Sequence, residues 1–113
     1  MLPRSQRLSV PQFNVVMKTG RVTHSSFFIL RAYRDNGIEG SRIAAVVPVK
    51  VAKTAVLRNR FRRKIYEAIG PLYPALLTNI HGIVFAKSDL LKAKTVDLEK
   101  DIRDLFVKGG LLK

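Results

Sequence analysis

Apolar residues recur at helical spacing in one long segment near the middle of the chain. In residues 55–69 they are separated by four, four and three positions, which places them on one face of an α-helix. These residues are Leu57, Phe61, Ile65 and Ala68. Thr54 stands where a helix N-cap belongs, and Gly70-Pro71 follows the last apolar position. The pattern therefore predicts a helix over residues 55–69.

A second helix is predicted over residues 95–108, with Thr95 as its N-cap and Gly109-Gly110 after its end. Its buried side is expected to consist of Leu98, Ile102, Leu105 and Phe106. Between the two predicted helices, Pro74 keeps the chain irregular or in short helical pieces.

A shorter helix is predicted over residues 11–18, opened by Ser9 or Pro11. Gly20 is expected to end it as a residue that adopts positive φ. The basic residues before this helix, through Ser9, are expected to form an extended arm.

Runs of β-branched and aromatic residues predict three strands, over residues 25–33, 41–47 and 81–87. Asp35-Asn36-Gly37 is a strong turn sequence between the first two, so we expect these two to form an antiparallel hairpin. Pro48 cannot donate to a strand ladder and is expected at a strand end. The predicted order is α-β-β-α-β-α, a two-layer α/β (α+β) sandwich with a mixed sheet.

The composition adds a large positive charge to this picture. At 113 residues and 12.7 kDa the chain is expected to form one domain, residues 1–113, with a modest core. Its net charge of +13 calls for a polyanionic partner, RNA or DNA before an acidic membrane surface. Cysteine is absent, which excludes disulfides and thiolate metal sites. No apolar stretch approaches the roughly 20 residues of a membrane span, so a cytoplasmic protein without membrane contact is expected.

The charge is concentrated on the predicted helix over residues 55–69. Residues 50–64 contain seven cationic side chains and no acidic one. Like charges four residues apart cost a helix a few tenths of a kcal/mol per pair, so this array does not serve the helix's own stability. Phosphate contact is therefore favoured over a merely solvated helix face. For Asn59 two interpretations stay open: a bridge to a phosphate or 2′-hydroxyl, or local hydrogen bonding within the helix.

These residues resemble the signature of the bacterial ribonuclease P protein subunit. That family carries an Arg-Asn-Arg core, an apolar residue, two further basic residues and a glutamate one turn later, as in residues 58–63 and Glu67. The resemblance extends over nearly the whole chain. Its other matches are Phe13, Gly20, Arg42-Ile43-Ala44, residues 83–87 and the last helix, residues 98–112.

The resemblance implies a ribosomal-protein-like sandwich with a left-handed β-α-β crossover, against the usual right-handed preference. It implies that the protein joins a catalytic RNA, as a monomer in a 1:1 ribonucleoprotein. The RNA holds the catalytic Mg²⁺ and removes the 5′ leader of precursor tRNA, while the protein binds the leader and eases the Mg²⁺ requirement.

The resemblance also assigns two groups of site residues. Those expected to bind the catalytic RNA are Lys50, Lys53, Arg58, Asn59, Arg60, Arg62, Arg63 and Lys64. Those expected in a leader-binding cleft are Phe13, Met17, Arg31 and Tyr33. For Phe13, Met17 and Tyr33 ordinary packing is the alternative. Met17 and Tyr66 depart from the family pattern, which more often has an aromatic and a basic residue at these positions.

No catalytic site is expected in the protein itself. Four of its eight acidic residues lie on the last predicted helix, where they balance nearby lysines and arginines better than they would hold a metal ion. His24 and His81 have no nucleophile to serve. Two alternatives remain: a structural RNA-binding protein of ribosomal type, and a DNA-binding module whose basic helix enters the major groove. A leader-binding subunit needs an open, stacking-capable face away from the basic helix, whereas a ribosomal protein does not.

Overall fold

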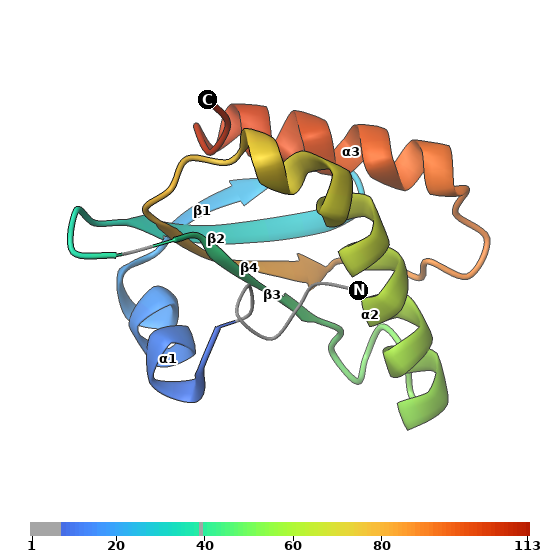
Figure 1. Cartoon of the computed structure of the whole chain (residues 1–113). Coiled ribbons are helices and arrows are strands. Elements are labelled where there is room, and N and C mark those ends of the chain that lie inside the picture. Colours follow the sequence, from blue (N-terminus) through green and yellow to red (C-terminus); the bar gives the residue numbers. More distant parts are fainter. Residues whose placement is uncertain (1–7, 39) are drawn as a thin grey trace.

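The computed structural model describes residues 8–38 and 40–113 and contains three α-helices, a 3₁₀ helix and four strands (Figure 1). The elements are α1 (Val10–Thr19), β1 (Arg21–His24), β2 (Phe28–Arg34), β3 (Arg42–Val46), α2 (Ala55–Ile69), η2 (Gly70–Ala75), β4 (Ile80–Ala86) and α3 (Thr95–Lys108). The predicted α+β class is confirmed, with one strand more than expected. The predicted basic arm falls mostly on residues 1–7, outside the described residues.

The four strands form one mixed sheet in the order β1-β2-β4-β3. The hairpin predicted between β2 and β3 is wrong, because β4 lies between them: β2 pairs with β4 antiparallel, and β3 pairs with β4 parallel. The hairpin partner of β2 is instead β1, a four-residue edge strand that was not predicted. Three of its four residues are exposed, so no alternation of apolar and polar positions marks it.

The Asp35-Asn36-Gly37 sequence does form a turn after β2. The Asp35 carboxylate accepts a hydrogen bond from the Gly37 amide at 2.8 Å, and Ile38 N–H donates to the Asp35 carbonyl at 3.0 Å. This side-chain-stabilised turn leads the chain across to β3 rather than into an adjacent strand. From β3 the chain passes through α2 to the parallel β4, so β3–α2–β4 is the β-α-β unit to which the resemblance assigns a left-handed crossover.

Helices cover both faces of the sheet. α2 and α3 pack on each other and on one face, and α1 lies against β2 and β4 on the other (Figure 1). The alternation along β4 divides its side chains between the two layers: Ile80 and Val84 belong to the main core cluster, whereas Ile83, also fully buried, does not. Val16 of α1 is likewise buried outside the main cluster. The main core therefore lies between the sheet and the α2–α3 pair.

Gly20 ends α1, but for a different reason from the predicted one. Its φ is −66°, so the positive-φ prediction is wrong. A Cβ at this position would lie 2.5 Å from the Val16 carbonyl oxygen, which accepts the Gly20 N–H at 2.7 Å. Glycine is required here by close approach of the chain to the last turn of α1. At the other end, Ser9 is the N-cap and forms a capping box with Gln12.

The start of α2 is as predicted. Thr54 is the N-cap and its hydroxyl accepts the Leu57 amide at 3.2 Å. Phe61, Ile65 and Ala68 are buried, and Leu57 packs against the core at partial burial. Beyond Ile69 the backbone continues into the 3₁₀ helix η2, which contains two of the chain's prolines. The apolar side of α2 is thus packed against the core, and its basic side faces outward.

Candidate nucleic-acid interface

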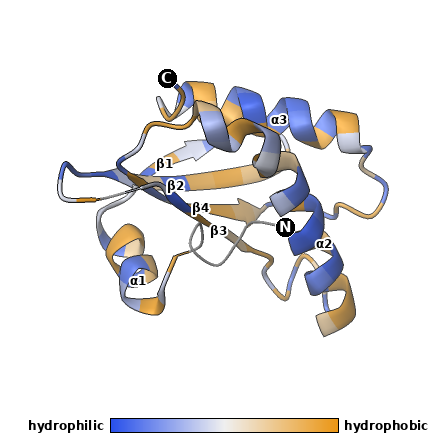
Figure 2. Ribbon diagram, in the orientation of Figure 1, coloured by the Kyte–Doolittle hydropathy of each residue, from blue (hydrophilic) through white to orange (hydrophobic). Residues whose placement is uncertain are grey.

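The basic residues of α2 lie on the sides of the helix that the core leaves uncovered. Asn59, Arg60, Arg62 and Arg63 are exposed, and Arg58 and Lys64 are partly buried. Figure 2 shows this hydrophilic middle stretch of α2, which follows a more apolar N-terminal tip. Among residues 8–38 and 40–113, none of the four arginines pairs with a carboxylate. Their charges therefore remain available to an external anion.

Arg58 connects α2 to the segment before it. One guanidinium nitrogen, Nη1, donates to the Ala52 carbonyl and to the Lys53 carbonyl, each at 3.1 Å. These two hydrogen bonds fix the backbone of the segment that carries Lys50 and Lys53, whose side chains are exposed. The structure thus places these two lysines in the segment that leads into the N-cap Thr54 of α2.

Asn59 is bonded to Arg62, one helical turn away. The Asn59 Oδ1 atom accepts from the Arg62 Nη2 atom. The carbonyl of the amide is therefore occupied within the helix, and the Nδ2 hydrogens remain as donors beside the remaining guanidinium hydrogens. This arrangement groups several donors on the exposed side of α2, where a phosphate could accept them.

Tyr66 serves the fold. It is buried, and its hydroxyl accepts the Ala45 amide at 3.1 Å, which ties α2 to β3. Where the family pattern often has a basic residue, this chain therefore has a side chain that holds the helix on the sheet. The bond joins residues 21 positions apart, so no local sequence pattern could predict it.

The four predicted leader-cleft residues lie on α1 and on β2, one of the strands that α1 packs against. Arg31 and Tyr33 alternate along β2 with the core residues Phe28 and Leu30, so they point away from the main core. Phe13 is partly buried on α1, and Met17 is 38% exposed. Arg31 joins strand and helix, because its Nη1 donates to the Met17 carbonyl at 3.2 Å.

Tyr33 interacts with the turn after β2. Its hydroxyl donates to the Asp35 carboxylate at 2.6 Å, which raises the pKa of Tyr33. The pKa of Asp35 is lowered, first by the Gly37 amide and then by the Tyr33 hydroxyl. Tyr33 therefore stays protonated at neutral pH, with its ring held near the end of β2 on the α1 side of the sheet.

The register adds two residues to this face that the sequence analysis did not assign. Tyr33 is opposite His81 of β4, and His81 is opposite Arg42 of β3, so the three form one row across the sheet. Burial, and then the positive charge of Arg42, lower the pKa of His81, which is therefore neutral at pH 7. In the sequence, only the alternation of side chains along the strands could have indicated that these two residues share a face with Tyr33. That inference also requires knowing that β3 pairs with β4.

The acidic residues of α3 include one with a clear structural role. Asp101 accepts hydrogen bonds from the Ser25 hydroxyl at 2.6 Å and from the Phe27 and Ser26 amides at 3.0 and 3.3 Å. It thereby fixes the turn between β1 and β2. In the part of the chain that the structure describes, no three His, Asp or Glu side chains are grouped to hold a metal ion. No helix in the same residues is long and apolar enough to cross a membrane.

Comparison with known proteins finds relatives that match nearly the whole chain. The family model described as Ribonuclease P matches residues 2–109. A ribonuclease P protein component from Microcystis aeruginosa is 29% identical over 115 residues, covering 98% of this chain and 96% of that protein. One from Synechococcus sp. is 36% identical over 116 residues, covering 99% of this chain and 87% of the relative.

Two solved structures show the same fold at low sequence identity. A Staphylococcus aureus RNase P protein mutant with defective mRNA degradation activity has a TM-score of 0.84 at 19% identity, over 96% of this chain and 92% of the other. The RNase P protein from Thermotoga maritima has a TM-score of 0.78 at 20% identity, over 90% and 96%.

Proposed function

Because this chain belongs to the ribonuclease P protein family, the protein component of an RNA-processing endoribonuclease, we propose that α2 binds the catalytic RNA and the α1 face of the sheet binds the 5′ leader of precursor tRNA. The RNA-binding residues on this proposal are Lys50, Lys53, Arg58, Asn59, Arg60, Arg62, Arg63 and Lys64. The family membership sets aside the ribosomal and DNA-binding alternatives.

The observation that carries the proposal for α2 is the exposure of arginines that have no carboxylate partner within residues 8–38 and 40–113. Cationic side chains that lie near one another without acidic partners destabilise a helix slightly, and contact with phosphates compensates for that cost. The rigid attachment of α2 supports the same role, since guanidinium groups that are already positioned lose less conformational entropy on binding.

The leader site is proposed on the opposite side of the sheet. Phe13 offers a partly exposed ring, Tyr33 a second ring, and Arg31 a guanidinium already fixed to α1. Stacking on such rings contributes about 1–3 kcal/mol per base and tolerates any base sequence. This suits a leader of varied sequence, and separation from α2 lets the protein hold both RNAs at once.

The remaining parts of the proposal concern the assembly. We place one copy of the protein with one catalytic RNA, acting in the cytoplasm on precursor tRNA, as a single domain. Mg²⁺, on which the family's reaction depends, would be held mainly by the RNA. The Asp101 carboxylate of α3 is engaged in hydrogen bonds to the β1–β2 turn.

Reconstitution tests the proposal as a whole. Adding the purified protein to a bacterial ribonuclease P RNA at limiting, low-millimolar Mg²⁺ should increase the rate of precursor tRNA cleavage. Single-turnover rates with and without the protein measure the effect. The expected product is a tRNA that has lost its leader and begins at the mature 5′ end. An RNA whose cleavage rate is the same with and without the protein would refute the assignment.

For the leader site, Phe13→Ala should weaken binding of precursor tRNA to the assembled enzyme by about 5- to 150-fold, the equivalent of one lost stacking contact of about 1–3 kcal/mol. Affinity for mature tRNA, which has no leader, should not change. The matched control is Val15→Ala on the same helix, where the side chain is 45% exposed. Equal losses for precursor and mature tRNA would show that Phe13 acts through packing alone.

A further inference from the structure

We propose that residues 87–94, the loop between β4 and α3, form a second part of the surface that binds the catalytic RNA, with Lys92 and Lys94 contacting its phosphates. This inference rests on the proposed function, because it extends the surface assigned to α2. The sequence resemblance assigned no residue of this loop to either RNA.

The loop is held in a defined shape. Leu90 is fully buried in the main core and anchors it. The Asp89 carboxylate accepts the Leu91 amide at 2.8 Å, and the Ala93 amide donates to the Leu90 carbonyl at 3.2 Å. A loop fixed by a buried anchor and a side-chain-stabilised turn presents its outer side chains without a large ordering cost on binding.

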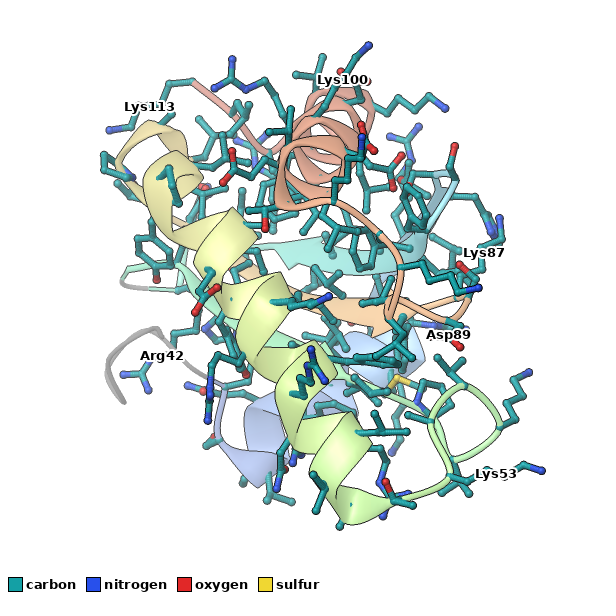
Figure 3. All side chains as sticks on the ribbon, turned by 90° about the vertical axis from the view of Figure 1, so that its right-hand side faces the viewer. Arg42, Lys53, Lys87, Asp89, Lys100 and Lys113 are labelled. Atoms are coloured by element: carbon teal, nitrogen blue, oxygen red, sulfur yellow. The ribbon has the colours of Figure 1, made fainter. Side chains whose placement is uncertain are left out.

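A residue of α2 links this loop to the basic helix. The Lys64 ammonium donates to the Leu90 carbonyl at 3.0 Å. Lys64 follows Arg60 by four residues, so the two share one side of α2. The loop therefore lies along the side of α2 that carries Arg60. Figure 3 shows this arrangement, with Lys87 and Asp89 marking the loop beside α2.

The loop carries three exposed lysines, Lys87, Lys92 and Lys94, and one exposed acid, Asp89. Lys92 and Lys94 are exposed, and neither has a carboxylate partner within the described ranges 8–38 and 40–113. The one acidic side chain, Asp89, is occupied by the Leu91 amide, and Lys87 donates to the Ser25 carbonyl at 3.0 Å. Leu91 is 44% exposed beside these lysines.

The start of α3 provides a second, independent observation. Thr95 was predicted as the N-cap, but the N-cap is Lys94, which makes no side-chain capping bond. Lysine is a poor choice there, because it offers no acceptor to the first amides and its charge adds to the positive end of the helix dipole. As on α2, a locally unfavourable cation is explained by an anion that binds it.

Lysines elsewhere on α3 provide a contrast. Lys100 is exposed but lines the same surface hollow as Asp97, Asp101 and Asp104. Its field is therefore offset by three neighbouring carboxylates. A variant with Lys100→Ala and Lys108→Ala changes the net charge by the same amount as one with Lys92→Ala and Lys94→Ala, and it serves as the matched control.

The test measures binding of the protein to ribonuclease P RNA, without tRNA, over a series of salt concentrations. The Lys92→Ala/Lys94→Ala variant should bind more weakly than the control, and the slope of log affinity against log salt should fall by about 1.4–1.8, the value for two phosphate contacts. A slope equal to that of the control would overturn the inference.

Lys64→Met keeps the aliphatic stem but removes the bond to Leu90. If Lys64 acts by holding the loop, its effect on RNA affinity should shrink when Lys92 and Lys94 are already alanine. Fully additive effects would show that the loop does not depend on Lys64 and would contradict this link.

Two further comparisons separate the possible failures. If Arg60→Ala/Arg63→Ala weakens RNA binding and the loop variant does not, the inference fails while the proposed function stands. If neither variant changes binding, the role proposed for α2 fails as well. If the loop variant lowers only the affinity of the assembled enzyme for precursor tRNA, then the loop binds the substrate and the assignment to the catalytic RNA is wrong.

Discussion

Replacing both Arg60 and Arg63 with alanine should lower the affinity for ribonuclease P RNA by roughly 100-fold or more at moderate salt. Each of these exposed guanidinium groups is expected to make a charge-assisted hydrogen bond to a phosphate, which contributes about 1.5–3 kcal/mol. A loss of about 1.4 kcal/mol corresponds to a factor of ten in affinity. Equilibrium binding of the protein to the RNA measures the change.

The salt dependence separates phosphate contact from indirect effects. Loss of two phosphate contacts should reduce the slope of log affinity against log salt by about 1.4–1.8. The matched control is Arg103→Ala/Lys108→Ala, which removes two exposed cations from α3. An α2 variant whose slope equals that of this control would mean that the basic side of α2 is simply solvated.

Lysine substitutions refine the same prediction. Arg60→Lys/Arg63→Lys keeps the charge but removes the planar pair of donors that binds a phosphate through two parallel hydrogen bonds. The salt slope should therefore be close to that of the unsubstituted protein, while the affinity falls. If lysine restores the full affinity, the surface provides charge alone and the geometry of the guanidinium groups is unimportant.

The sequence predicted α2 well because the signals are local. A four-residue spacing of apolar positions, a threonine cap and a glycine-proline end all lie within about twenty residues of one another. The sheet order was predicted wrongly because it depends on distant pairing. β3 and β4 are parallel neighbours separated by α2 and η2, and nothing in the β3 sequence identifies its partner. The exposed strand β1 was missed for want of a buried face.

The candidate site divides in the same way. Recognition of the Arg-Asn-Arg pattern predicted which residues bind RNA, and that assignment stays a prediction. The structure adds that the first predicted group lies on α2 and the segment before it, and the second on α1 and β2. The Lys64 bond to the loop and the Asp101 bonds to the turn join residues 26 and 74–76 positions apart, so only the packed fold could reveal them.

A core substitution should produce the largest loss of stability. Phe61 is 1% exposed and lies on the apolar side of α2, between arginines that face outward. Phe61→Ala removes most of a buried ring and should lower the free energy of unfolding by about 3–5 kcal/mol. Urea denaturation followed by far-ultraviolet circular dichroism measures this change.

The substitution Phe61→Leu tests whether the loss arises from the missing volume. Leucine refills much of the space and should recover a large part of the stability, because the cost of a cavity grows with its residual volume. Binding to ribonuclease P RNA, measured where each variant is folded, should follow the anchoring of α2: weakened in Phe61→Ala and near normal in Phe61→Leu. Unchanged RNA affinity in a folded Phe61→Ala protein would show that the arginines do not depend on this anchor for their positions.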